Sequence, residues 1–153
     1  MIVELRNVSK TFAGRTAVAG IDLQVPTGSC FGLLGPNGAG KTTTLRMIYG
    51  VTRPSAGAVL VFGRDLAREA RAIRARLGVT LQDNVFIEAL SPVENLRVFG
   101  RYHLMREPEL SRRVDELVDF LELRSHADVP VRALSGGFQR RLAIAMSLVN
   151  RPE

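Results

Sequence analysis

The sequence of 153 residues predicts an α/β fold organised around a phosphate-binding loop, and three features of one stretch lead to that prediction. Residues 35–42 fit the pattern G-x-x-x-x-G-K-[ST]. A short apolar run at 30–34 precedes them and has the length of a buried strand. Residues 41–49 follow with apolar side chains at helical spacing, and Gly50 suits the end of that helix.

The residue types of this loop suit the charge of a triphosphate. Gly35, Gly38 and Gly40 lack a Cβ, so the backbone can curl and aim its N–H groups inward. The following helix adds free N–H groups and a partial positive charge. We expect Lys41 to meet the β- and γ-phosphates and Thr42 to offer a hydroxyl to Mg²⁺. The alternative is a chance match in a glycine-rich loop, and the flanking strand and helix argue against it.

Composition places the chain among ordinary single domains. Hydrophobic residues make up 46% of the sequence, and the mean hydropathy is +0.08. No apolar run approaches the ~18–20 residues of a membrane span, and the first residues alternate and carry a charge, unlike a signal peptide. The one cysteine, Cys30, excludes an internal disulfide and fits a reducing compartment. We expect it to be a small core residue in a strand.

The net charge of +6 admits nucleic acid, an anionic membrane surface or a nucleotide as partner. The densest basic group is interpreted as a solvated helix surface, with a binding patch as the alternative; it comprises Arg64, Arg68, Arg71, Arg74 and Arg76. The few aromatic residues and the lack of tryptophan disfavour base stacking.

The first part of the chain has the pattern of antiparallel strands. Residues 2–8 alternate in hydrophobicity, and 16–18 and 21–25 predict two further strands joined by short turns. After the loop helix, we expect a strand at 58–62, a charged helix at 69–76 and a strand at 77–81. This alternation of strands and helices predicts a parallel sheet.

The strand pattern then gives way to helices. Ser91, Pro92 and Glu94 form a strong helix start, and apolar residues repeat at helical spacing up to residue 123. We therefore expect a helical insertion in the α/β core. The expected divisions are 1–82 for the β subdomain and loop core, 83–134 for the helical subdomain, and 135–153 for a last turn and its helix.

That last turn is a second candidate anion site. Ser135, Gly136 and Gly137 open a helix, which presents backbone donors, a dipole and a hydroxyl. Alone, Ser-Gly-Gly is a common helix cap and turn. Its occurrence in one chain with the phosphate-binding loop makes the pair specific.

With these motifs in order, the chain resembles the nucleotide-binding subunits of ABC transporters. Residues 134–139 look like the LSGGQ signature, with Phe138 in place of the usual glutamine. The resemblance implies a P-loop NTPase core with an antiparallel β subdomain and a helical insertion. It also implies ATP and Mg²⁺ as ligands. The nucleotide-binding residues implied are Phe12, Val18, Gly35, Pro36, Asn37, Gly38, Ala39, Gly40, Lys41, Thr42, Thr43, Ser135, Gly136 and Gly137.

The resemblance assigns further roles and partners. Lys41 and Gln82 are implied as catalytic residues, Thr42 and Gln82 as metal contacts, and Phe12 as the aromatic that stacks on adenine. Phe12 as a core-edge aromatic and Gln82 as a polar strand cap are the alternatives. His103 and His126 match no motif of the family, so we expect surface or helix-end positions for both.

Details around the loop and at 94–102 look most like ATPase subunits of two-gene exporters, such as drug or nodulation lipo-oligosaccharide exporters. The implied function is ATP hydrolysis that powers export through ATP-driven, head-to-tail dimerisation. The implied partners are a second ATPase subunit, most simply another copy, and an integral membrane permease, with no nucleic acid. The implied location is the cytoplasm, on the inner face of the membrane.

The family's Walker B strand, with its metal-holding Asp and catalytic Glu, and the switch histidine after it have no counterpart in the sequence. We expect an N-terminal fragment truncated before that strand, with no turnover by itself. A soluble ABC ATPase that acts on ribosomes or DNA, and a nucleotide-binding module without turnover, are the competing hypotheses.

Overall fold

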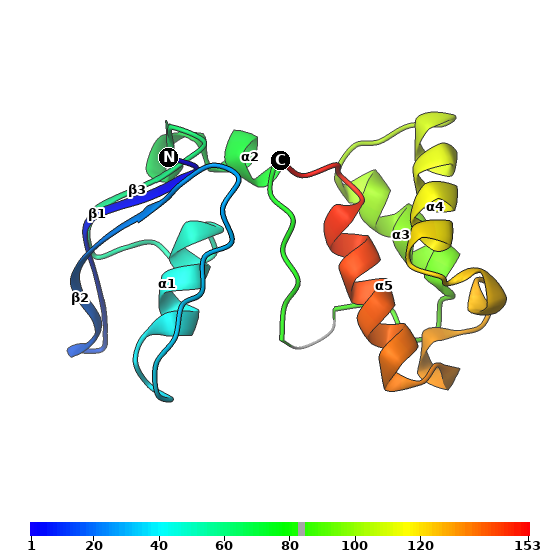
Figure 1. Cartoon of the computed structure of the whole chain (residues 1–153), viewed down its shortest axis with the longest axis horizontal. Helices are drawn as coiled ribbons and strands as arrows, with labels where there is room; N and C mark the ends of the chain where they lie inside the picture. The colour runs from blue at the N-terminus through cyan, green and yellow to red at the C-terminus, as the bar shows by residue number, and fades with distance from the viewer. Residues whose placement is uncertain (83–84) are drawn as a thin grey trace. The chain divides into compact units, whose positions relative to one another are not determined.

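A computed structural model of the chain describes residues 1–82 and 85–153 (Figure 1). The chain divides into two compact units, Met1–Arg74 and Ala75–Glu153.

The first unit is built on a four-stranded sheet with the order β2-β1-β3-β4. Its strands are β1 (Val3–Phe12), β2 (Arg15–Val25) and β3 (Ala56–Val61), which are labelled in Figure 1, and the short β4 (Arg64–Asp65). All the pairings in this sheet are antiparallel. The antiparallel start is therefore confirmed, whereas the predicted parallel sheet is wrong for the described residues.

The parallel prediction fails because the apolar runs at 30–34 and 77–81 are not strands. A strand needs a neighbouring backbone to satisfy its N–H and C=O groups, and neither run pairs with another strand in the described part of the chain. Leu34 is 92% exposed, and Cys30 is exposed instead of lying in a core strand.

β2 is one strand where the sequence predicted two. The irregularity falls at Gly20, which takes a φ of +58° and donates its N–H to Ser9 Oγ at 2.8 Å. The register with β1 shifts on both sides of Val8. The bulge is therefore absorbed within a continuous strand.

Two helices contact this sheet: α1 (Lys41–Ile48) meets β2 and β3, and α2 (Leu66–Arg74) meets β3 and β4. α2 begins before the expected residue 69 because Asp65 Oδ1 accepts the N–H of Ala67 at 2.9 Å. The buried apolar residues of the unit are Leu5, Val8, Val18, Met47, Val59, Val61, Leu66 and Ile73.

The arginines of α2 lie on its exposed surface, as expected of a solvated face. Arg74 Nη1 donates to Gly50 O at 3.3 Å, and Arg64 of the neighbouring β4 pairs with Glu69 of α2. Arg68 and Arg71 are exposed.

The second unit is helical, which confirms the expectation for 91–123. Its elements are α3 (Pro92–Tyr102), α4 (Glu109–Phe120), α5 (Gly136–Leu148) and the 3₁₀ turns Arg124–His126 and Val131–Ala133. The three α-helices contact one another around a core of leucine, valine, alanine and methionine side chains. α3 starts with a capping box, in which Ser91 Oγ accepts the Glu94 N–H at 3.3 Å and Glu94 Oε2 accepts the Ser91 N–H at 2.8 Å.

One buried amide shapes the chain before α3. Asn95 is 0% exposed; its Oδ1 accepts the Ile87 N–H at 2.8 Å, and its Nδ2 donates to Leu90 O at 3.3 Å and to Ser91 O at 3.0 Å. Residues 87–91 thus keep a defined path without regular secondary structure. The expected subdomain boundary at residue 83 lies outside the described residues.

Candidate nucleotide-binding site

The phosphate-binding loop ends at the start of α1, where Gly40 is the N-cap residue with a φ of 85°. No side chain caps this helix start, so the first N–H groups of α1 remain available. A Cβ on Gly40 would lie 2.6 Å from Ala17 O and 3.1 Å from Val18 Cγ2. Glycine is therefore required here by the close approach of the loop to β2.

The ammonium group of Lys41 contacts the backbone at the start of this loop. Its Nζ donates to Gly35 O at 2.6 Å and to Pro36 O at 2.8 Å. The Ala39 N–H donates to Pro36 O at 3.2 Å, which closes the turn inside the loop. Thr42 is exposed and Thr43 is half-buried. The ammonium group, the Thr42 hydroxyl and the open helix start therefore belong to one exposed site that suits a polyanion.

Phe12 lies at the end of β1 and is 48% exposed. Lys10 Nζ stands 4.8 Å from the centroid of its ring. Val18, which pairs with Lys10 in the sheet register, is buried and lies beneath Gly40. Lys10 belongs to no motif, but its two-residue spacing from Phe12 on one strand places both side chains on the same face.

The signature turn is exposed at the surface of the second unit. Ser135 is the N-cap of α5, yet its side chain makes no capping hydrogen bond. Ser135, Gly136 and Gly137 are all exposed. A Cβ on Gly136 would meet nothing within 4 Å, and one on Gly137 only Ser135 Oγ at 3.9 Å. This turn is thus an exposed second helix start with open space beside Gly136.

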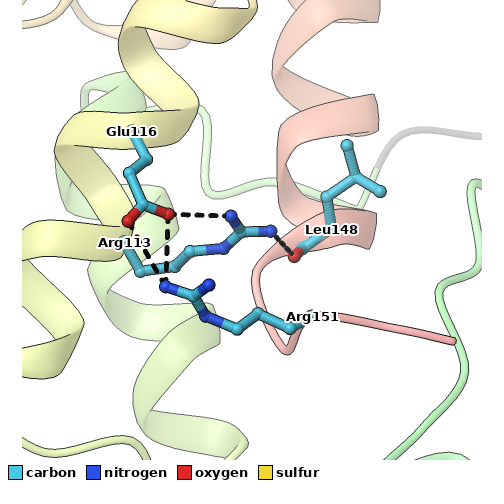
Figure 2. A network of polar contacts seen from close by, with 4 residues as sticks. All are labelled: Arg113, Glu116, Leu148 and Arg151. Carbon is cyan, nitrogen blue, oxygen red and sulfur yellow. Dashed lines mark hydrogen bonds and ion pairs between the residues drawn. The ribbon is translucent and has the colours of Figure 1, made fainter.

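The far end of α5 is held by a closed ring of contacts (Figure 2). Arg113 Nη2 on α4 donates to Leu148 O at 2.6 Å, and its Nη1 donates to Glu116 Oε2 at 3.0 Å. Arg151 donates its backbone N–H to the same Leu148 O at 3.0 Å, and its Nη2 donates to Glu116 Oε2 at 3.2 Å. The Arg113 guanidinium holds the pKa of the Glu116 carboxyl below its ordinary value, and Arg151 adds to this effect.

A guanidinium at this position also complements the negative end of the helix dipole. This ring could not be identified from the sequence, because its members come from separate segments and belong to no motif.

Gln82, the other candidate from the sequence, is exposed in the second unit, whereas the phosphate-binding loop belongs to the first. Within 1–82 and 85–153, no group of three or more His, Cys, Asp or Glu side chains is placed to hold a metal ion. Thr42 fits a metal that takes one protein hydroxyl and completes its shell from phosphates and water, as Mg²⁺ does.

His103 caps the C-terminal end of α3, where partial burial lowers the pKa of its imidazole. His126 lies in the first 3₁₀ turn and is half-buried. The expected helix-end and surface positions are thus confirmed for both histidines.

The sequence profile described as ABC transporter matches residues 18–153. The chain belongs to the ABC transporter family. It is 45% identical over 152 residues to Nod factor export ATP-binding protein I of Cupriavidus metallidurans, covering 99% of this chain and 50% of that protein. It is 44% identical over 151 residues to the protein of the same name in Sinorhizobium fredii, covering 99% and 44%. This ABC chain therefore spans about half the length of the curated relatives it matches.

Solved structures of ABC ATPases share its fold, which confirms the predicted α/β P-loop class. One is cbiO1 from Clostridium perfringens, part of the ABC transporter complex cbiONQ, with a TM-score of 0.86, 27% identity, and coverage of 99% of this chain and 62% of that one. Another is the ATP-binding cassette MJ0796 in a dimeric post-hydrolysis state bound to ADP and Pi, with a TM-score of 0.85, 30% identity, and coverage of 98% and 70%. Across the described ranges, no helix is both long and apolar enough to cross a membrane.

Proposed function

We propose that this chain is the ATP-binding part of a subunit that binds and hydrolyses ATP to power an ABC exporter, and that it works as a head-to-tail pair. The observation that carries the proposal is the open start of α5, where Ser135 leaves the helix uncapped and a Cβ on Gly136 would meet nothing within 4 Å. No neighbour within the described second unit requires glycine at that place. The free space suits a surface supplied by another molecule, and free helix N–H groups favour an anion.

In this proposal, the loop at 35–42 holds the phosphates of one ATP, and Lys41 stabilises the charge that develops during phosphoryl transfer. Ser135, Gly136 and Gly137 of a second copy contact the γ-phosphate from the other side. Phe12 stacks on the adenine, and the loop's other members place their backbone N–H groups toward the phosphates. Thr43 contacts a phosphate, and Val18 contributes an apolar contact near the base.

Thr42 and Gln82 are the residues that would hold Mg²⁺, which when bound offsets the charge on the phosphate oxygens. Gln82 would also link the γ-phosphate and the metal to the contact with the membrane subunit. Both side chains are exposed, so each is free to meet a ligand.

The partners follow from the same proposal. A second copy of the chain completes each site, and an integral membrane permease receives the movement at the cytoplasmic face of the membrane. The relatives named for Nod factor export support export as the direction. The proposed divisions remain 1–82, 83–134 and 135–153, and no nucleic-acid partner is needed.

Mixing two inactive variants tests the head-to-tail arrangement. Lys41→Ala removes the phosphate grip but leaves the turn at Ser135 intact, whereas Ser135→Arg blocks the turn but leaves the loop intact. Each variant alone should fail to dimerise in a non-hydrolysable ATP analogue with Mg²⁺. Their mixture should form heterodimers with one intact site, measured by sedimentation. A mixture that behaves like either variant alone contradicts the proposal.

A further inference from the structure

Phe138 and His126 are two residues to which the proposed function gives no role. Phe138 replaces the glutamine expected at its place in the signature, and His126 belongs to no motif. In the structure they contact each other: their ring centroids are 4.1 Å apart, and the ring planes are tilted by 38°. The structure therefore pairs two residues that no sequence motif connects.

A second contact holds the Phe138 ring from its own helix. The Arg141 guanidinium carbon lies 5.5 Å from the ring centroid, within the range of a cation–π interaction. Arg141 is itself fixed, because its Nη1 donates to Glu122 Oε2 at 2.8 Å. The Phe138 ring is thus contacted both by His126 of the 3₁₀ turn and by Arg141 of the next turn of α5.

The position of Phe138 makes this ring contact important for the turn. Phe138 is the third residue of α5, and the Gln139 N–H makes the bond to Ser135 O at 3.0 Å that closes the first helical turn. The N–H groups of Gly136, Gly137 and Phe138 precede that bond and have no partner within the helix. A side chain that fixes Phe138 therefore also fixes the direction of one of the N–H groups offered to an anion.

The turn needs such an anchor because its other members provide none. Ser135 makes no capping hydrogen bond, and two successive glycines have more backbone freedom than any other pair. The residue after Phe138 is also tied down: Gln139 Nε2 donates to Val131 O at 3.2 Å and to Leu134 O at 3.3 Å. Phe138 and Gln139 are thus the first side chains after the glycines that tie the turn to the rest of the unit.

We propose that Phe138, stacked on His126, is a positioning residue for the signature turn and aims its backbone donors at the nucleotide of a second copy. This inference rests on the proposed function, because it assumes that the turn meets a nucleotide across a dimer. The stack replaces, by aromatic contact, the ordering that a capping side chain would give.

The test compares His126→Ala, His126→Phe and Phe138→Ala in the whole chain. The measured quantities are the midpoint of dimerisation with a non-hydrolysable ATP analogue and Mg²⁺, the ATP affinity of the single chain, and the melting temperature. Loss of the stack should weaken dimerisation by about threefold to tenfold. ATP affinity should not change, because the phosphate-binding loop is in the other unit. His126→Phe keeps an aromatic ring against Phe138 and should restore dimerisation.

Two matched controls separate positioning from stability. Arg113→Met loosens the same helix at its far end, and His103→Ala removes a histidine at the end of α3. Both should leave the dimerisation midpoint unchanged. A purely structural role for the stack predicts instead that Arg113→Met weakens dimerisation as much as His126→Ala does.

Unchanged dimerisation in His126→Ala, or no recovery in His126→Phe, overturns the inference while leaving the proposed function intact. If Phe138→Ala does not fold, the two His126 variants decide. If the unmodified chain binds the analogue but does not dimerise, the proposed function fails, and this inference fails with it.

Discussion

At the start of α1, a Cβ on Gly40 would lie 2.6 Å from a backbone oxygen of β2, whereas at the start of α5 a Cβ on Gly136 would meet nothing within 4 Å. Both helices begin without a side-chain cap. The first glycine is demanded by the fold of its own unit, and the second is not. The comparison teaches that one sequence signal, glycine at the start of a helix, can result either from internal packing or from the need to leave room for an external surface.

The two helices also differ in how they are held. α1 buries only Thr44 and Met47 and follows an exposed apolar run. α5 buries Leu142, Ala145 and Met146 in the core of its unit and is tied at its far end to α4. The phosphate-binding loop therefore depends on its contact with β2, whereas the signature turn is free at its backbone and anchored through nearby side chains.

The largest expected effect comes from Gly40→Ala against Gly136→Ala. The new Cβ of the first variant meets the Ala17 carbonyl and requires a left-handed backbone, so we expect a loss of about 3 kcal/mol in the free energy of unfolding. Gly136→Ala should leave that free energy unchanged within about 0.5 kcal/mol. Denaturant unfolding of both variants measures the difference. Equal losses would show that both glycines serve internal packing.

Lys41→Ala should come next, and it acts on binding instead of folding. Its ammonium is the charged side chain of the loop, so its removal should weaken ATP binding by about tenfold to a hundredfold. Calorimetric titration of the folded variant measures this. Lys10→Ala is the matched control; it removes a lysine that stands over Phe12, and we expect a smaller loss. Equal ATP affinity in Lys41→Ala and the unmodified chain would contradict the phosphate assignment.

Arg113→Met should have a smaller effect, and only on the second unit. It removes two hydrogen bonds but also a buried Nε that has no partner in the described structure. The net loss should be about 1 kcal/mol in the free energy of unfolding, because a hydrogen bond formed on folding replaces one to water. Arg124→Met, which removes an exposed guanidinium paired with α4, should not change the melting temperature. An unchanged free energy of unfolding in Arg113→Met would show that the ring in Figure 2 is not what secures α5.

The smallest expected effect is on pH dependence. The pKa of Glu116 is lowered in the folded chain, chiefly by its hydrogen bond with Arg113. The stabilisation it contributes is therefore complete above the ordinary carboxyl pKa and is lost as the pH falls through the lowered value. Glu116→Gln should remove this part of the acid dependence, seen as a slightly flatter curve of melting temperature against pH. Superimposable curves would mean that Glu116 does not take part.

The sequence predicted the family better than it predicted the sheet. Residues 35–42 and 135–137 could be identified because each motif has its residue types and spacing within one short stretch. The helix starting at Ser91 was equally local, since its capping box lies within four residues. The apolar runs at 30–34 and 77–81 were wrongly predicted as strands, because an apolar run becomes a strand only when a partner backbone lies beside it. The contact between Phe138 and His126 could not be predicted for a related reason, since neither residue type indicates a contact with the other.

The buried amide of Asn95 has a consequence for how the surface near α3 can evolve. It holds the 87–91 segment by main-chain atoms alone, and the N–H groups of Val131 and Arg132 add bonds to Leu90 O and Glu88 O. The exposed side chains of Glu88 and Ala89 take no part in those bonds. The side chains at these two positions can therefore change in charge or size during evolution, while the backbone of 87–91 keeps its path.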